Sequence, residues 1–505
     1  MNEIGIHMPR GQRLAVTASI MLATVMQTLD STIANVALPH MQGAVSATQD
    51  QISWVLTSYI VAAAIMTPPT AILTEWLGRK KLFIIAIAGF TVASMLCGIS
   101  ENLSEMIGAR LLQGIFGAGL VPLSQTVVLD MYPPHKQGQA MAWWGIGVMV
   151  GPILGPTLGG YLTDAYNWRW VFFINVPLGA IALFGMATFL PNSVRQRVRP
   201  FDVIGFTMLS IAIGSLQLFL DRGQSQDWFS STEIITEFVM MIMFGYLFLV
   251  HMFSAKHPFI EPSLFRDRNL SAGLVLAFVV GIVLLATMAL LPPLLQNLVG
   301  FPVSTTGNVM APRGVGTMIA MWIVGRMISR TDPRYLMLFG LSLTAISLWE
   351  MSLFNLNIGP WDVVRTGVIQ GFGLGFIFIP MSTMIFATLK PELRTEGSSM
   401  YALTRNIGSS IGISIMMTML AQHTQTYHSI LAEKVNPFRH GINIPEIWNT
   451  QYLAGVSAIN SEVTRQASSI AYMADFRIMM WVTLCAIPLL VFMRMPKFPA
   501  EPAAA

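Results

Sequence analysis

Long apolar stretches recur along the whole of this 505-residue chain and constrain its fold more than any other feature. A helix needs about 20 mainly apolar residues to cross the hydrocarbon core of a bilayer. Such segments lie near residues 14–38, 52–73, 82–100, 104–129, 138–162, 168–190, 203–221, 233–252, 270–297, 305–328, 335–353, 362–388, 397–421 and 478–494. The sequence therefore predicts an all-α membrane protein with fourteen transmembrane helices.

The composition excludes a soluble protein of this length. Charged residues make up 11% of the chain and hydrophobic residues 54%, whereas an average soluble domain is about 25% charged. There are too few charges to cover a water-facing surface, so most of the exterior must face lipid. The two cysteines, Cys97 and Cys485, lie in apolar segments and offer neither a disulfide framework nor a metal site.

The basic residues indicate the orientation. Most of them fall in loops that would share one side of the membrane: Arg10, Arg13, Arg79, Lys80, Lys81, Lys136, Arg195, Arg197, Arg199, Lys256, Arg266, Arg268, Arg330, Arg334, Lys390, Arg394, Arg494 and Lys497. The short loops of the other side hold only Arg169 and Arg222. Because basic loops stay in the cytoplasm, we expect both termini there, in a multi-pass protein of the cell inner membrane. The same bias explains the net charge of +4 without a nucleic-acid partner.

Two distant segments resemble each other. Residues 113–124 and 370–382 both begin with Gln-Gly, continue as glycine-rich runs and end in Pro-x-Ser. Two related halves are a transporter arrangement, although glycine-rich apolar helices also resemble each other by chance. We expect one six-helix bundle over 1–200, an inserted helix pair over 201–255, and a second six-helix bundle over 256–505 with a long polar periplasmic loop, 422–477.

A short basic turn after the second apolar segment is a candidate cytoplasmic gate. It contains Glu75, Gly78, Arg79 and Lys80. A glycine turn with paired bases and one acid can hold the inner ends of two helix bundles together through charge contacts. An ordinary basic cytoplasmic loop would have the same composition.

The segment near 138–162 repeats small residues and prolines. They are Gly147, Gly151, Pro152, Gly155, Pro156, Gly159 and Gly160. Small residues every four positions let a neighbouring helix approach closely, and prolines bend a helix. The pattern by itself predicts tight helix packing.

Charged residues at membrane depth are the main candidates for coupling, because each costs at least about 2.5–3.5 kcal/mol at a helix centre. Asp30 lies in the first apolar segment, near Gln27 and Asn35. A buried carboxylate near a guanidinium can bind and release a proton, and Arg110 lies near the start of the apolar segment 104–129. A hydrogen-bonded structural acid and a structural arginine are the alternatives.

Other polar residues within the apolar segments are candidates for the substrate cavity. The set is Gln27, Asn35, Gln113, Arg313 and Arg405. Because embedded charge leans positive, the cavity should prefer neutral or weakly acidic lipophilic compounds over multivalent cations.

Several kinds of site are missing from the sequence. It has no G-x4-G-K-[S/T] phosphate loop, so ATP does not drive transport through this chain. No histidine pair is poised for haem and no aspartate-rich cluster indicates a membrane enzyme. We therefore predict a protein that is not an enzyme and has no cofactor and no metal site.

Four segments carry a family resemblance. The 71–80 loop is similar to the signature loop of the major facilitator superfamily, with Ala71, Glu75 and Trp76 as departures. The glycine-proline segment resembles the antiporter motif of drug:proton exporters in that superfamily. Residues 29–39 and 168–177 resemble the fourteen-helix drug:proton antiporter family of EmrB and QacA.

This resemblance covers essentially the whole chain and implies the fold and the activity. The fold would be that of the major facilitator superfamily, with two six-helix bundles and an inserted helix pair. The activity would be multidrug efflux, and hence antibiotic resistance, driven by the proton motive force, with Arg110 assisting the coupling acid. Substrates of EmrB-type members include uncouplers, acidic quinolones and fatty acids. Their partners are an EmrA-like periplasmic adaptor and a TolC-like outer-membrane channel.

Alternatives remain open for the activity and for the long loop. The chain could export or import one specific hydrophobic metabolite, such as a fatty acid. The 422–477 segment has apolar residues such as Tyr427, Ile430, Val435 and Phe438. They fit either docking of the adaptor or a lid over the outer mouth of the cavity.

Overall fold

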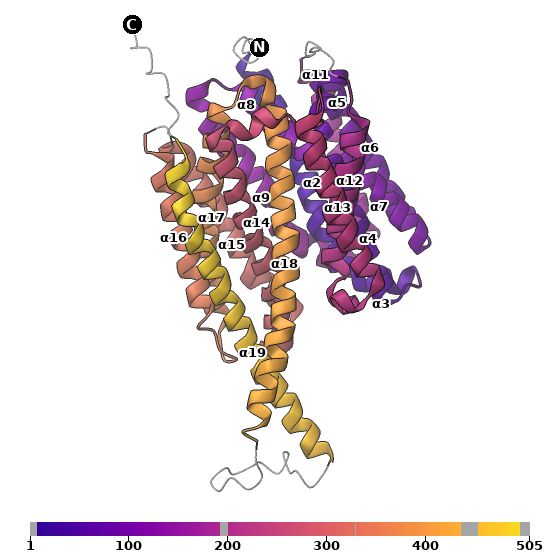
Figure 1. Ribbon diagram of the computed structural model, residues 1–505, viewed down its shortest axis with the longest axis vertical. Coiled ribbons are helices and arrows are strands. Elements are labelled where there is room, and N and C mark those ends of the chain that lie inside the picture. The colour runs from indigo at the N-terminus through magenta and orange to yellow at the C-terminus, as the bar shows by residue number, and fades with distance from the viewer. Residues whose placement is uncertain (1–7, 192–199, 329, 436–452, 495–505) are drawn as a thin grey trace.

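In the computed structural model, the part of the chain that is described is built from helices and has no strand. The description covers residues 8–191, 200–328, 330–435 and 453–494. The helices stand side by side in one bundle, and two of them project beyond it at one end (Figure 1). The predicted all-α membrane fold is confirmed.

The described residues 8–191 are called the first half. Its helices are α2 (Arg10–Ala44), α3 (Gln49–Ile52), α4 (Trp54–Met66), α5 (Thr70–Leu77), α6 (Arg79–Ile99), α7 (Leu103–Gly117), α8 (Leu120–Met131), α9 (Pro134–Ala165), α10 (Trp170–Phe173) and α11 (Asn175–Phe189). Helices α4 and α5 meet at an angle of 59°. Pro68 and Pro69 lie between them and cannot donate backbone hydrogen bonds, which explains the break.

The remaining helices form the inserted pair and the second half. The pair is α12 (Val203–Arg222) and α13 (Thr232–Ser254), joined by η1 (Gln224–Gln226) and η2 (Trp228–Ser230). The second half comprises η3 (Pro262–Arg266), α14 (Arg268–Pro293), η4 (Leu294–Val299), α15 (Val303–Met327), α16 (Pro333–Met351), α17 (Pro360–Thr388), η5 (Pro391–Leu393), α18 (Arg394–Ala432), α19 (Leu453–Ala486) and η7 (Ile487–Phe492).

The same scheme of helix packing occurs in both halves. In the first half α2 packs on α9 and α11, α7 on α4 and α6, and α11 on α6. In the second half α14 packs on α18 and α19, α17 on α15 and α16, and α19 on α16. Helix α12 contacts α4 of the first half and α18 of the second. The inserted pair therefore lies against both halves.

Each of the fourteen predicted segments falls on a helix or on a pair of consecutive helices. Within the described residues, nine helices are long and apolar enough to span a membrane, or up to eleven if two bent pairs are counted. Helices α15, α16 and α18 are not among them. Polar residues such as Arg313 in α15 and Arg405 in α18 face the protein and lower the apolarity of these helices. The count of fourteen stays a prediction.

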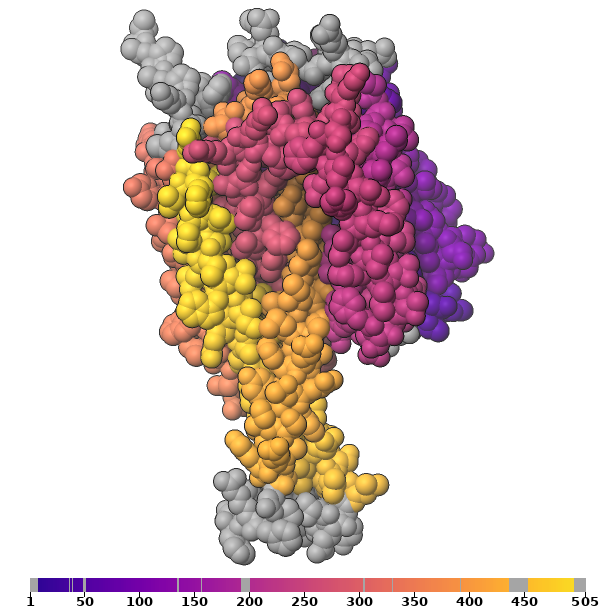
Figure 2. Space-filling view, viewed as in Figure 1, coloured from indigo at the N-terminus to yellow at the C-terminus, as the bar shows by residue number. Residues whose placement is uncertain are grey.

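The long 422–477 segment is not an irregular loop over its described part. Helix α18 continues to Ala432 and α19 begins at Leu453, so both helices extend far past their predicted ends. Together they form a projecting hairpin, and α18 runs down between α19 and the inserted pair (Figures 1 and 2). The apolarity criterion missed the extensions because a helix in water needs no apolar run. Phe438 and the rest of 436–452 lie outside the described residues.

Candidate functional site

Asp30 lies at the centre of a buried polar network in the first half. Its side chain, on α2, has 0% exposure. It accepts hydrogen bonds from Arg110 Nη1, Gln113 Nε2 and Asn175 Nδ2, each at 2.8 Å. Three helices, α2, α7 and α11, therefore meet at one carboxylate.

Arg110 is held in place from several directions. Its Nε donates to the carbonyl oxygen of Val55 at 3.0 Å, and Nη1 also donates to Gln113 Oε1 at 2.8 Å. The guanidinium stands over the rings of Tyr59 and Phe172, 4.8 and 5.4 Å from their centroids. Cation–π contacts of this kind are strongest where water is excluded. The arginine is thus fixed to α4 as well as to Asp30.

The pair of Asp30 and Arg110 is electrically neutral, and this determines its chemistry. Two unpaired charges at this depth would be expensive, whereas a hydrogen-bonded pair is tolerated. Arg110 Nη2 and Asn175 Oδ1 have no protein partner among the described residues. The network therefore keeps one donor and one acceptor in reserve, and a proton bound to Asp30 would release Arg110 from its counter-charge.

The structure brings together three predicted residues, Asp30, Arg110 and Gln113, and connects a fourth. Gln27 Nε2 donates to the hydroxyl of Tyr59 at 3.0 Å, and the Tyr59 ring covers Arg110. Asn35 is exposed and lies outside this network. One further turn and a half along α2 takes Asn35 away from the carboxylate.

Sequence reasoning missed Asn175 and Tyr59 as members of the site. Asn175 also donates to Ser94 Oγ at 2.9 Å, which ties α11 to α6. A usable signal was present for Asn175, since an asparagine at the start of an apolar helix needs hydrogen-bond partners. Tyr59 gave no such signal, because a tyrosine in an apolar segment usually serves packing.

The glycine-rich face of α9 packs directly against α2 beside Asp30. A Cβ added to Gly151 would lie 2.6 Å from the backbone nitrogen of Leu29, and Thr32 Oγ1 donates to the Gly151 carbonyl at 3.2 Å. Gly155 faces Thr32, and Gly147 faces Met21 at 3.4 Å. Helix α9 bends by 42° between the segments that end at Gly155 and begin at Thr157.

The other members of the motif are placed less tightly. Pro152 is half-buried and Gly159 is buried. A Cβ added to Gly160 would meet nothing within 4 Å. The close approach to α2 is therefore carried by the part of the motif from Gly147 to Gly155.

The basic turn contacts an acid that sequence reasoning did not single out. Arg79 forms an ion pair with Asp130 of α8, and Arg394 of α18 binds the other oxygen of Asp130 at 3.1 Å. Gly78 has a φ of 79°, a conformation that favours glycine. Glu75 and Lys80 are half-buried on either side of this glycine. Asp130 thus joins the two halves at the end of the bundle where α8 ends and α18 begins.

Further contacts join the two halves along the surface where they meet, which is called the seam. Ser398 Oγ donates to Gln125 Oε1 at 2.6 Å. The ring of Trp144 on α9 stacks on Phe378 of α17 with the centroids 6.2 Å apart. The two halves are therefore joined at this end of the bundle by an ion-pair cluster, a hydrogen bond and a ring contact.

Two predicted cavity residues lie in the second half. Arg313 is 7% exposed, and its Nη2 donates to the Leu284 carbonyl at 3.3 Å. The buried Gln370 donates to Thr287 Oγ1 at 3.2 Å. Leu284 and Thr287 are neighbours on one face of α14, so Arg313 and Gln370 reach the same part of that helix. Among the described residues, Arg313 Nη1 and Gln370 Oε1 have no protein partner.

Arg405 is the second predicted cavity residue in this half. It is half-buried on α18, and its guanidinium stands 5.8 Å from the ring centroid of Phe378 and 6.0 Å from that of Tyr401. No ion pair with Arg313 or Arg405 occurs within the described part of the chain. Arg313 and Arg405 therefore differ from Arg110 of the first half, which is paired with Asp30.

Comparison with known proteins identifies the family. The family profile described as Major Facilitator Superfamily matches residues 20–413. The chain belongs to the major facilitator superfamily. It is 38% identical to the multidrug export protein EmrB of Escherichia coli K12 over 429 residues, 85% of this chain and 84% of that protein.

Further relatives agree with this assignment to the EmrB-type branch of the superfamily. The probable multidrug resistance protein EmrY of Escherichia coli K12 is 33% identical over 497 residues, 97% of each chain. The fatty acid resistance protein FarB of Neisseria gonorrhoeae is 35% identical over 431 residues, 85% of each. The human organic anion transporter MFSD10 has a similar structure, with a TM-score of 0.61 at 14% identity, covering 95% of this chain and 100% of that one. That likeness shows the fold alone.

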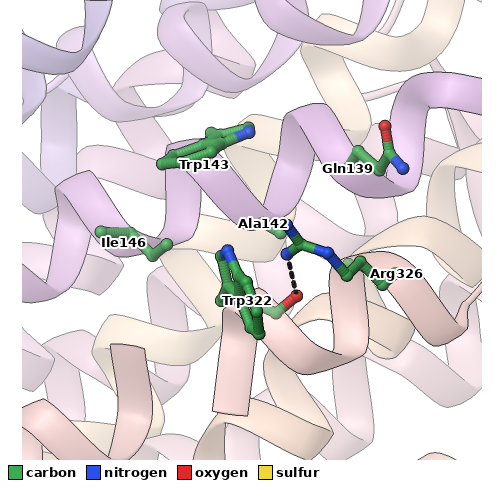
Figure 3. Close-up of a pocket in the computed structure, with 7 residues that line it drawn as sticks. Gln139, Ala142, Trp143, Ile146, Trp322 and Arg326 are labelled. Atoms are coloured by element: carbon green, nitrogen blue, oxygen red, sulfur yellow. Dashed lines mark hydrogen bonds between the residues drawn. The ribbon is translucent and has the colours of Figure 1, made fainter. Parts of the chain in front are cut away.

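A small pocket of this superfamily member lies between α9 and α15, away from Asp30. Its volume is about 130 Å³, and Trp143 and Trp322 stand on opposite sides of it (Figure 3). Arg326 lies over the Trp322 ring at 3.5 Å from its centroid and donates to the Trp322 carbonyl at 3.4 Å. None of the predicted site residues lines this pocket.

Proposed function

We propose that this chain is a proton-driven multidrug efflux antiporter of the cell inner membrane, with both termini in the cytoplasm. Its relatives EmrB and EmrY are named as multidrug export and multidrug resistance proteins. The observation that carries the proposal is Asp30, which is fully buried and held by Arg110 within a membrane-spanning helix. No catalytic step is needed for this activity.

The geometry of the network explains how a proton could be exchanged for a substrate. When Asp30 is charged, it binds Arg110, Gln113 and Asn175 and holds α2, α7 and α11 together. A proton taken up from the outside neutralises Asp30 and weakens its bond to Arg110. Because α9 packs on α2 next to Asp30, a change in this bond would reach the helix that lines the seam with the second half. Release of the proton to the cytoplasm completes the cycle.

Everted membrane vesicles with an imposed proton gradient test this function. The wild-type chain should accumulate a fluorescent substrate while protons leave the vesicle lumen. Asp30→Asn should bind substrate but lose substrate-triggered proton release. The matched control is Asp164→Asn, because Asp164 is exposed on α9. Normal exchange in Asp30→Asn would show that Asp30 has a structural role only.

The charges of the second half support a preference for lipophilic neutral compounds and weak acids. Arg313 is buried and one of its Nη atoms has no protein partner among the described residues. Arg405 stands among aromatic rings that suit flat ligands. A carboxylate or phenolate would compensate these cations, whereas a dication would be repelled.

Competition in vesicles tests the preference. A lipophilic weak acid should inhibit transport of a neutral dye at lower concentration than a bis-cationic dye does. Arg313→Gln should weaken inhibition by the acid more than inhibition by a neutral competitor. Equal inhibition by acid and dication in the wild-type chain would contradict the preference.

A second candidate function is the transport of one specific hydrophobic metabolite, such as a fatty acid. The similarity to the fatty acid resistance protein FarB favours it. The two functions differ in the range of compounds that are transported. A multidrug exporter should exchange several unrelated lipophilic compounds for protons, whereas a specific transporter should accept fatty acids only.

The projecting hairpin supports a role in assembly with an EmrA-like periplasmic adaptor and, through it, a TolC-like outer-membrane channel. Ile430, Leu453 and Val456 are 43, 88 and 46% exposed on the part of α18 and α19 that leaves the bundle. Exposed apolar side chains on such an extension are typical anchors of an interface. A hairpin that acts as a lid is the competing arrangement.

A further inference from the structure

A second buried acid lies in the other half of the protein, at the base of the hairpin. Asp475 of α19 has 0% exposure. Among the acids of the described residues, Asp30 is the other one with 0% exposure. Its Oδ1 is 3.3 Å from Nδ1 of His423 on α18. The His423 side chain is 29% exposed. One end of the pair is thus sealed and the other reaches solvent.

The surroundings of Asp475 are almost entirely apolar. Its neighbours along α19, Tyr472, Phe476 and Met479, belong to an apolar cluster to which α14, η4, α16 and α17 also contribute. Among the described residues, Tyr472 on α19 and Tyr427 on α18 are titratable groups beside the pair, and the Tyr427 ring lies 6.2 Å from that of His423. Within the described residues, Asp475 Oδ2 has no hydrogen-bond partner. Hydrogen bonds therefore do little to stabilise a negative charge here.

We propose that Asp475 and His423 form a second proton-binding site, which takes up a proton from the outer side of the membrane. With a neutral imidazole and an ionised carboxyl, the pair has a net charge of −1 inside an apolar cluster. A single bound proton makes the pair neutral. Burial of a net charge is unfavourable, so proton binding is the means by which this pair can be accommodated. Access of protons from the outer side rests on the membrane orientation given in the proposed function.

The geometry defines the path of the proton. A proton from water binds Nε2 of the half-exposed His423, the proton on Nδ1 passes to Oδ1 of Asp475, and the imidazole is neutral again in the other tautomer. The net change is one proton gained by the carboxyl and none by the histidine. His423 is the relay and Asp475 the acceptor.

The position of the pair gives the bound proton a structural effect. His423 and Asp475 connect α18 to α19, the two helices that project beyond the bundle (Figure 1). Helix α18 also packs along α14 and carries Arg405 in its middle. Loss of charge at Asp475 would weaken the link between α18 and α19 and thereby connect outer acidity to a helix of the second half.

Infrared difference spectroscopy of the purified full-length protein in lipid nanodiscs tests the site without any substrate. Lowering the pH from about 8 to about 5, a range in which a buried carboxyl can take up a proton, should produce a carboxylic-acid carbonyl band. Asp475→Asn should lose its part of this band, and Asp475→Glu should retain one at a shifted position. His423→Gln should slow the appearance of the band after a rapid pH drop, because it removes the relay.

Asp30→Asn and Asp164→Asn separate this proposal from the proposed function. Asp30→Asn should keep the Asp475 band even though it abolishes substrate-triggered proton release. Asp164→Asn should leave the spectrum unchanged. A spectrum of Asp475→Asn identical to that of the wild-type chain would overturn the second site, whatever the outcome for Asp30.

Discussion

The pairing of Asp30 with Arg110 makes an asymmetric prediction about stability. Asp30→Asn keeps the shape of the side chain but leaves the guanidinium of Arg110 buried, at 0% exposure, without a counter-charge. Removing one partner of a buried ion pair costs about 3–5 kcal/mol. An arginine in this position cannot escape by losing its proton, so we expect the full loss in the free energy of unfolding.

Arg110→Gln should be milder. Asp30 would retain its hydrogen bonds from Gln113 and Asn175, both at 2.8 Å, and could bind a proton to become neutral. The loss is then one hydrogen bond to a charged group, about 1.5–3 kcal/mol. The double variant, Asp30→Asn with Arg110→Gln, contains no buried charge at the site. It should regain about 1–3 kcal/mol relative to Asp30→Asn alone.

Reversible unfolding from mixed micelles would measure these free energies as a double-mutant cycle. Arg365→Gln is the matched control, because Arg365 is 54% exposed and lies 3.5 Å from Glu350. Its loss should stay within about 1 kcal/mol. The reasoning fails if Arg110→Gln is as destabilising as Asp30→Asn, or if the double variant shows the sum of the two single losses.

Three further predictions concern the seam, the glycine face and the hairpin. Asp130→Asn removes the carboxylate charge that Arg79 and Arg394 share, each part-buried, and should raise cysteine labelling from the cytoplasmic side several-fold, as expected for about 1 kcal/mol. Gly151→Val should abolish transport in vesicles, because its Cβ would lie 2.6 Å from the backbone of α2, whereas Gly160→Ala should be neutral; equal activity of the two would contradict the packing argument. Ile430→Ser with Val456→Ser should leave exchange in vesicles intact but abolish co-purification with an adaptor; failed exchange in vesicles would indicate a lid instead.

The sequence predicted the positions of the helices well, because apolar length is a direct consequence of burial in lipid. The family resemblance pointed to Asp30 and Arg110 as the coupling residues, and polarity marked Gln113 separately as a candidate for the substrate cavity. The structure places the three side chains in contact, and their roles stay predictions. Asn35 was chosen for its polarity alone, and polarity does not say which face of α2 a residue occupies.

Other features could not have been found in the sequence. Asp130 looked like any acid near a helix end, and only the folded chain brings Arg79 and Arg394 to its two oxygens. Asp475 lay in a segment interpreted as a polar loop, so its burial went unrecognised. In both cases the decisive contact joins residues of different helices that are more than 50 positions apart in the chain, which local composition cannot reveal.

The two halves have the same helix packing but different charges, and this difference suggests how the work is divided. Gln113 and Gln370 occupy corresponding positions, and each donates to a residue of the first helix in its half. In the first half the acceptor is Asp30, at 2.8 Å, and in the second it is the neutral Thr287, at 3.2 Å. The first half thus has a carboxylate that can bind a proton next to its arginine. The second half has Arg313 with no acid beside it among the described residues, so an anionic substrate group could take the place that Asp30 occupies in the first. On this reasoning, the proton of Asp30 acts on the first half, an acidic substrate is held by the second half, which also carries Asp475, and the seam through α9 and α15 connects them.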